Sequence, residues 1–269
     1  MADAPVRDPL FRDPWAALRS ATRARIGLGR SGDTQRLADV LAFQLAHARA
    51  RDAVHAALDG DALAEVVAPY PSVQVRSLAV DRATYLRRPD LGRRLDPVCI
   101  ASLPPGNWDA AFAAVDGLSA VGVAHHAGRL FAACRARLRG WRLAPLVIAT
   151  QGRVALGDEI GAALGAKLVV VMIGERPGLS VADSLGVYIT HAPCSGLQDF
   201  QRNCISNIHD QGGLEIEAAA DKLVWLMTEA RRLKLTGVGL KDMAPALAAP
   251  DAAGLSDHLT RRNMELGPQ

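Results

Sequence analysis

Short apolar runs recur along the second half of the chain, and polar or glycine-rich residues follow them. Four such runs predict strands, at residues 110–115, 145–150, 167–173 and 185–190. The run at 167–173 is apolar on both faces, as a central strand of a parallel sheet is. Three stretches have helical character, at residues 119–138, 154–164 and 215–235. This β-α-β-α-β order predicts an α/β fold, a Rossmann-like doubly wound parallel sheet.

The first hundred or so residues have mainly helical character. Asp13-Pro14 is a favourable helix start, since it offers an N-cap carboxylate and a proline at the first helical position. Apolar residues at 3-and-4 spacing predict an amphipathic helix from near Gly32-Asp33 to about Leu58. Residues 73–78 are compatible with a short strand.

Prolines 97, 104 and 105 mark a change of pattern, and we place a domain boundary there. We therefore expect a helical N-terminal region at 1–104, a Rossmann-like domain at 105–242 and a loose C-terminal tail at 243–269.

Composition and charge exclude several classes of protein. The chain is 49% hydrophobic and 22% charged, which is ordinary for a globular protein. Its net charge of +3 comes without a clustered basic excess, so a nucleic-acid-binding surface is not expected. No apolar stretch approaches the roughly 20 residues that span a bilayer, and the N-terminus has no signal-peptide pattern. The four cysteines form no CxxC pair, so we expect reduced thiols and a cytoplasmic location.

Three of the loops that follow predicted strands could line a ligand site. They are residues 116–119, 151–154 and 174–178, and each contains glycine. Ligands of open parallel sheets bind at the carboxyl ends of the strands, and glycine lets the backbone approach a ligand closely. The residues predict a pocket at this edge without identifying its ligand.

Familiar catalytic motifs are missing or misplaced. The letters of the dinucleotide motif occur at Gly27–Gly32, but there they follow a predicted helix instead of a strand. A GxSxG nucleophile elbow is absent. His125 and His126 lie next to each other in a predicted helix, so they should point to different faces and make a poor metal pair. This favours a binding or partner subunit. A stand-alone Rossmann-type enzyme with a nucleotide cofactor and a purely structural subunit remain the alternatives.

Seven stretches of the sequence resemble one known family. They are Asp13–Trp15, Phe43–Val54, Tyr85–Gly92, Asp116–Ala120, Gly152–Asp158, Gly174–Leu179 and Asn203–His209. In this order and spacing, over residues 10–242, they resemble the small (light) subunit of ethanolamine ammonia-lyase.

The resemblance implies a division of labour. A large partner subunit would hold ethanolamine, and the small subunit would help bind adenosylcobalamin for the radical conversion of ethanolamine to acetaldehyde and ammonia. The helical N-terminal region would make subunit contacts, and this chain would supply no catalytic residue and no metal ligand. The expected location is the cytoplasm, including a bacterial microcompartment within it.

The cofactor contacts implied by the resemblance fall on Val154, Glu175 and Cys204. A small apolar side chain, a carboxylate that accepts hydrogen bonds and a soft thiol all suit a corrinoid and its nucleotide tail. Taken without the resemblance, Val154 would be read as plain core and Cys204 as an inert buried thiol. The motif D-x-H-x-x-G is absent, which implies that the dimethylbenzimidazole base stays on cobalt.

Overall fold

The computed structural model describes residues 13–241 and 243, and a six-stranded sheet forms its centre. The strands are β1 (Ser72–Arg76), β2 (Ala111–Val115), β3 (Leu146–Thr150), β4 (Leu168–Gly174), β5 (Leu185–His191) and β6 (Asn203–Ile208). Their order across the sheet is β1-β3-β2-β4-β5-β6. The four strands predicted from apolar runs are confirmed, each within one residue at either end.

Eight α-helices accompany the sheet in the described part of the chain. They are α1 (Ala16–Ala21), α2 (Leu37–His55), α3 (Gly60–Val67), α4 (Arg82–Arg87), α5 (Pro97–Ile100), α6 (Ala120–Arg137), α7 (Leu156–Leu164) and α8 (Ile216–Leu233). Local chemistry sets several ends. The Ser119 hydroxyl accepts a hydrogen bond from Gly122 N at 3.2 Å and caps α6, whereas α7 ends at Gly165, whose φ of 70° favours glycine.

The sheet is mixed, which corrects the expectation of a fully parallel one. Strands β1, β3, β2 and β4 run parallel to one another. Strand β5 is antiparallel to β4, and β6 is antiparallel to β5. The connection from β4 to β5 spans only residues 175–184 and contains no helix. A parallel return needs a crossover of about a dozen residues or more, so this short loop dictates the antiparallel turn.

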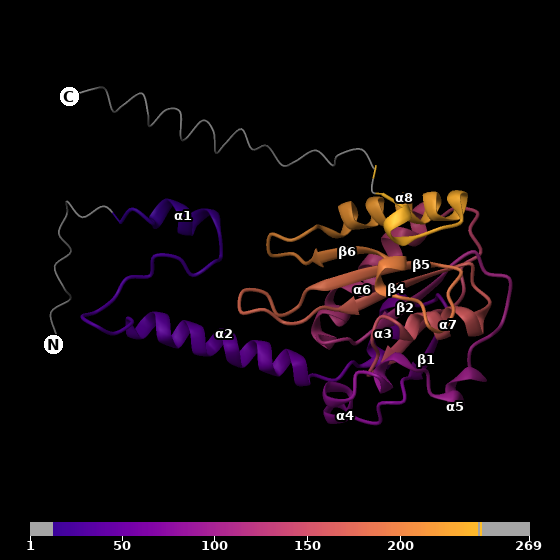
Figure 1. Ribbon diagram of the computed structural model, residues 1–269, viewed down its shortest axis with the longest axis horizontal. Coiled ribbons are helices and arrows are strands. Elements are labelled where there is room, and N and C mark those ends of the chain that lie inside the picture. Colours follow the sequence, from indigo (N-terminus) through magenta and orange to yellow (C-terminus); the bar gives the residue numbers. More distant parts are fainter. Residues whose placement is uncertain (1–12, 242, 244–269) are drawn as a thin grey trace, which may run out of the picture.

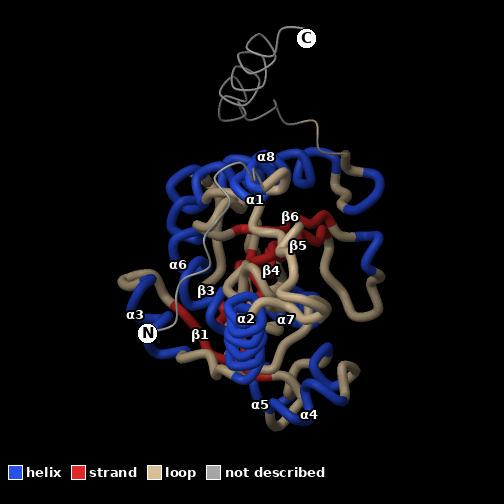
Figure 2. Tube along the Cα trace, turned by 90° about the vertical axis from the view of Figure 1, so that its left-hand side faces the viewer, coloured by secondary structure: helices blue, strands red, loops and turns tan. Residues whose placement is uncertain are grey.

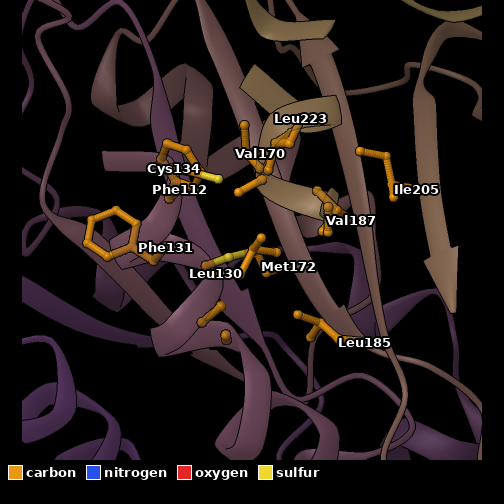
Figure 3. Close-up of a cluster of buried hydrophobic side chains, with 14 of the residues drawn as sticks. Phe112, Leu130, Phe131, Cys134, Val170, Met172, Leu185, Val187, Ile205 and Leu223 are labelled. Carbon is orange, nitrogen blue, oxygen red and sulfur yellow. The ribbon is translucent and has the colours of Figure 1, made fainter. Parts of the chain in front are cut away.

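Helices cover both faces of the sheet (Figure 2). Alternate residues of β2 belong to different buried clusters: Phe112 packs in one with α3, α6 and α8, and Ala113 packs in the other with α7. Figure 3 shows the first cluster, where Phe112 and Phe131 meet edge to face with ring centroids 5.3 Å apart. The two cores hold the strand ends in fixed positions.

Helix α2 reaches away from the sheet instead of packing on it (Figure 1). The helix is present as predicted, and Leu37, Leu41 and Leu45 lie four residues apart on it. Their exposed fractions are 71%, 54% and 53%, so the part of the chain that the structure describes leaves this apolar stripe largely uncovered. Ala53 is the buried residue of α2.

The N-terminal region is not purely helical, because β1 joins the edge of the sheet beside β3. A strand there was expected, but its place in the main sheet was not. The predicted domain boundary near residue 104 stays a prediction. Strand β1 precedes that boundary in the sequence but belongs to the same sheet as the strands after it. The expected tail at 243–269 lies outside the described residues except for the exposed Met243.

Candidate functional site

The three strand-end loops meet at one edge of the sheet, as predicted. The Asp116 carboxylate accepts hydrogen bonds from the backbone N–H groups of Gln151 and Gly152, at 2.8 and 3.0 Å. Leu118 N donates to Gly174 O at 2.9 Å, which joins the loop after β2 to the end of β4. These bonds bring the segments after β2, β3 and β4 together.

Asp116 is a structural member of this edge. It is buried, and Arg82 Nη1 lies 3.7 Å from its Oδ2. Burial raises the pKa of the Asp116 carboxyl, and the two backbone donors and Arg82 oppose that shift. Its oxygens are occupied by the chain itself, so it positions the loops and is not presented to a ligand.

Glu175 follows β4 and is held between the start of β5 and the end of β6. Its Oε2 accepts a hydrogen bond from the Ser184 hydroxyl at 2.6 Å, and Asn207 N lies 3.3 Å from both carboxylate oxygens. A Cβ at Gly186 would stand 2.9 Å from Glu175 Oε1. Glycine at position 186 therefore leaves room for the carboxylate to lie over β5.

Cys204 is exposed on β6 and is therefore not the buried thiol that it would be taken for without the resemblance. It lies opposite Tyr188 of β5. Burial raises the pKa of Tyr188 to about 12, and the neighbouring Cys204 and Glu175 add to the shift. Desolvation also raises the pKa of the Cys204 thiol, with the Tyr188 hydroxyl opposing it and Glu175 adding to it. Glu175, Tyr188 and Cys204 thus form one surface, which we call the β5–β6 surface. Sequence reasoning missed Tyr188, because strand pairing is not visible in the sequence.

Val154 lies just before α7 and is half-buried. It lines a surface cavity of about 810 Å³ together with Arg153, Asp158, Glu159 and residues 195–199. Val154 and Tyr188 both pack partly against the same buried cluster, the one that contains α7. Val154 is therefore on the same face of the sheet as Tyr188, at the mouth of a cavity, and not in the plain core.

A buried ion pair, Asp158–Arg202, lies between this cavity and β6. Arg202 donates to both carboxylate oxygens of Asp158 at 2.6 and 2.7 Å, and the two side chains are 1% and 2% exposed. Arg202 also donates to Thr190 Oγ1 and to Leu197 O, each at 3.0 Å. The pair connects α7 to the segment that leads into Cys204. The two residues are 44 positions apart in the sequence, so sequence reasoning could not pair them.

These residues fit a large amphipathic ligand. The face offers an open thiol, a phenol ring and a half-buried aliphatic group, and Glu175 adds a fixed carboxylate. Gly27–Gly32, the other candidate, follows α1 and not a strand, so the phosphate-binding context is absent there. Among the described residues, no helix is long and apolar enough to cross a membrane.

Comparisons with known proteins agree with one another. The family model described as ethanolamine ammonia-lyase light chain matches residues 12–241. The chain is 50% identical over 258 residues to the ethanolamine ammonia-lyase small subunit of Azotobacter vinelandii, covering 92% of this chain and 95% of that protein. It is 49% identical over 243 residues to the small subunit from Ralstonia nicotianae, covering 87% and 90% of the two chains. The small subunit from Xanthomonas campestris is 50% identical over 243 residues, with coverage of 87% and 89%.

Proposed function

Because the chain belongs to the ethanolamine ammonia-lyase light-chain family, we propose that it is the subunit that helps hold adenosylcobalamin against a large catalytic subunit. The chemistry supplied by that group is homolysis of its cobalt–carbon bond, which starts the radical conversion of ethanolamine to acetaldehyde and ammonia. This chain binds and orients the cofactor and takes no proton or hydrogen atom in the reaction.

The observation that carries the proposal is the β5–β6 surface. Two of the three expected contact residues, Glu175 and Cys204, gather there around Tyr188 although 29 positions of sequence separate them. The third, Val154, lies on the same face at the cavity beside α7. Glu175 directly follows the end of β4, beside the edge where parallel sheets bind ligands, and Tyr188 and Cys204 lie level with the middle of β4.

Each residue has a distinct role in this proposal. Glu175 accepts hydrogen bonds from amide or hydroxyl groups of the cofactor, with its carboxylate already oriented by Ser184. Cys204 is small and soft, so it permits close packing against a corrin edge or the nucleotide tail. Val154 excludes water from the apolar side of the contact.

The proposal also covers fold type and location. The unit β2-α6-β3-α7-β4 is Rossmann-like and doubly wound, which is supported by α6 and α7 packing in the clusters on opposite faces of the sheet. The proposed location is the cytoplasm, including a microcompartment where the host makes one. Cell fractionation with an antibody to the chain tests the location.

The test of function is reconstitution with the large subunit. We expect the co-expressed complex to form acetaldehyde from ethanolamine only when adenosylcobalamin is added. Cys204→Trp places a bulky ring on the β5–β6 surface and should weaken cofactor affinity by about tenfold or more, which is the loss of roughly 1.4 kcal/mol. Arg139→Trp, at an exposed position outside this surface, is the matched control.

Other results would reject the proposal in different ways. Equal cofactor affinity of Cys204→Trp and wild type, with an intact complex, would favour a purely structural subunit. A purified chain that retains a nucleotide and turns over substrate alone would favour the stand-alone Rossmann-type enzyme.

A further inference from the structure

Two adjacent histidines approach one carboxylate, and none of the three residues is among the proposed cofactor contacts. His125 Nδ1 lies 3.1 Å from Asp183 Oδ2, and His126 Nε2 lies 4.0 Å from the same oxygen. One ligand atom from each of the three side chains can be chosen so that all lie within 4.8 Å of one another. Sequence reasoning expected the two histidines to point to different faces. They converge because one approaches through the nitrogen nearer the backbone and the other through the nitrogen at the far end of its ring.

The loop that carries Asp183 is fixed against the start of α6. The Ser119 hydroxyl donates to Ala182 O at 2.8 Å. A Cβ at Gly122 would stand 2.6 Å from Ser184 O and 3.0 Å from Asp183 O, so only glycine lets the loop come this close. Asp183 therefore faces the second turn of α6 in a position set by the backbone.

His126 is the unusual member of the cluster. The residue is 1% exposed, and neither Nδ1 nor Nε2 has a hydrogen-bond partner. A buried polar group without a partner is costly, and such groups in native structures call for an explanation such as an ion or ligand. Nε2 is directed at Asp183, so a cation between them would satisfy the imidazole.

The surrounding charges favour a cation. Burial lowers the pKa of the His126 imidazole. Asp210 and Asp183 act on this ring in the opposite direction, and His125 and Arg129 act in the same direction as burial. Asp210 is paired with Arg129 at 2.7 Å, so Asp183 contributes the local excess of negative charge.

We propose that His125, His126 and Asp183 form a site for a divalent cation of the zinc class. Two imidazoles and one carboxylate are a ligand set that Zn²⁺ accepts, with water in the fourth position. Tetrahedral coordination at about 2.0–2.1 Å places ligand atoms about 3.4 Å apart. The observed 3.1 and 4.0 Å lie on either side of that value, and all three ligand atoms lie within 4.8 Å of one another, so side-chain rotations would bring them to the metal. Gln211 Nε2, 3.5 Å from Asp183 Oδ1, orients the carboxylate.

The site would connect α6 to the loop between β4 and β5. Asp183 is followed by Ser184, whose hydroxyl binds Glu175. A bound cation would therefore fix the loop next to the β5–β6 surface. The inference itself rests on the three ligands and not on the cofactor proposal.

Equilibrium dialysis of the metal-stripped full-length chain against ZnCl₂ tests the site. We expect one zinc per chain, and we expect His125→Asn and Asp183→Asn each to weaken binding by about tenfold or more, since even groups that only orient ligands contribute that much. His55→Asn, in α2, is the control and should bind as wild type does. Co²⁺ in place of Zn²⁺ should give the intense visible absorption of tetrahedral cobalt.

The test uses His125→Asn and Asp183→Asn because these side chains are less buried than His126, whose replacement could prevent folding. Zinc binding that is equally strong in wild type, His125→Asn and Asp183→Asn would show adventitious binding by surface histidines and overturn the site. Absence of zinc binding by the folded wild-type chain would overturn it as well.

Discussion

Glu175 is oriented by its own chain before any ligand arrives. Ser184 and Asn207 use part of its capacity to accept hydrogen bonds. A carboxylate has about four lone-pair sites, so acceptor capacity remains for a ligand. An acceptor that is already in position loses little entropy on binding, which strengthens the contact.

Replacement of this carboxylate by an amide should weaken cofactor binding. Glu175→Gln keeps the shape and removes the charge, and a hydrogen bond to a charged group is worth roughly 1.5–3 kcal/mol. We expect the Kd for adenosylcobalamin to rise by about tenfold to a hundredfold, with little change in the rate at saturation. Titration of cofactor into the complex, followed by acetaldehyde formation, measures both quantities.

Glu229→Gln is the control for loss of a carboxylate, because Glu229 pairs with Arg232 on α8, away from this surface. Ser184→Ala removes a group that only positions Glu175, so it should raise the Kd by a smaller factor and leave the saturated rate unchanged. An unaltered Kd in Glu175→Gln would remove this residue from the site.

The pair Asp158–Arg202 should make a large contribution to stability through the cost of breaking it. Arg202→Met leaves a buried carboxylate without its partner, which typically costs about 3–5 kcal/mol. Urea unfolding should show this loss in the free energy of unfolding. The double variant Asp158→Leu/Arg202→Met should recover most of it, since an apolar pair removes the unpaired charge. A single variant within about 1 kcal/mol of wild type would mean that water enters and solvates Asp158.

At the scale of elements, α2 has an apolar stripe that no other described segment of the chain buries. A Leu side chain contributes about 1.5–3 kcal/mol when it moves from exposed to fully buried. The name of the small-subunit relatives implies a large-subunit partner, and we propose that this partner covers the helix. The stripe of Leu37, Leu41 and Leu45 is therefore the part of the N-terminal region best suited to the subunit contact.

Removal of the stripe should weaken assembly and spare the fold. The double variant Leu41→Ser/Leu45→Ser should raise the Kd for the large subunit by about tenfold or more. Circular dichroism of the chain should stay the same, because these side chains bury little within it. The control is Val98→Ser, which also replaces an exposed apolar side chain by serine; Val98 is 77% exposed and lies on α5. Undiminished assembly of the double variant, measured by analytical ultracentrifugation, would place the subunit contact elsewhere.

The strands differed in how well the sequence predicted them. Strands β2 and β4 are buried along their whole length, and continuous apolar runs identify such strands. Strand β6 was missed because it is at the edge of the sheet, where Ile205 and Ile208 are its only buried residues. The direction of β5 was wrong because an apolar run is the same for parallel and antiparallel pairing, and only the length of the preceding loop distinguishes them.

At the scale of the whole molecule, we expect the isolated chain to be inactive. At its strand-end edge the Asp116 carboxylate is already engaged by two backbone N–H groups, so it is not available as an acid or base toward a small amine. Ethanolamine with adenosylcobalamin should give no acetaldehyde until the large subunit is added. Turnover by the chain alone, after mass spectrometry has excluded the large subunit, would contradict this.

The sequence predicted which edge of the sheet the candidate loops share, but not which side chains come together there. The loops after β2, β3 and β4 were predicted to share one edge of the sheet, and they do. The family resemblance supplied Val154, Glu175 and Cys204, whose contact with a ligand stays a prediction. The contact between Glu175 and β6 depends on antiparallel pairing of β5 with β6, which the sequence did not reveal. The convergence of His125 and His126 depends on which ring nitrogen each presents, and a helical wheel carries no such information.

The uncovered stripe on α2 also sets a requirement for protein production in the cell. Exposed apolar surface is a route to aggregation while a chain waits for its partner. Chains made in excess of the large subunit are therefore the ones that chaperones must retain or proteases remove. Balanced synthesis of the two subunits, by translation from a shared message, would keep that waiting pool small.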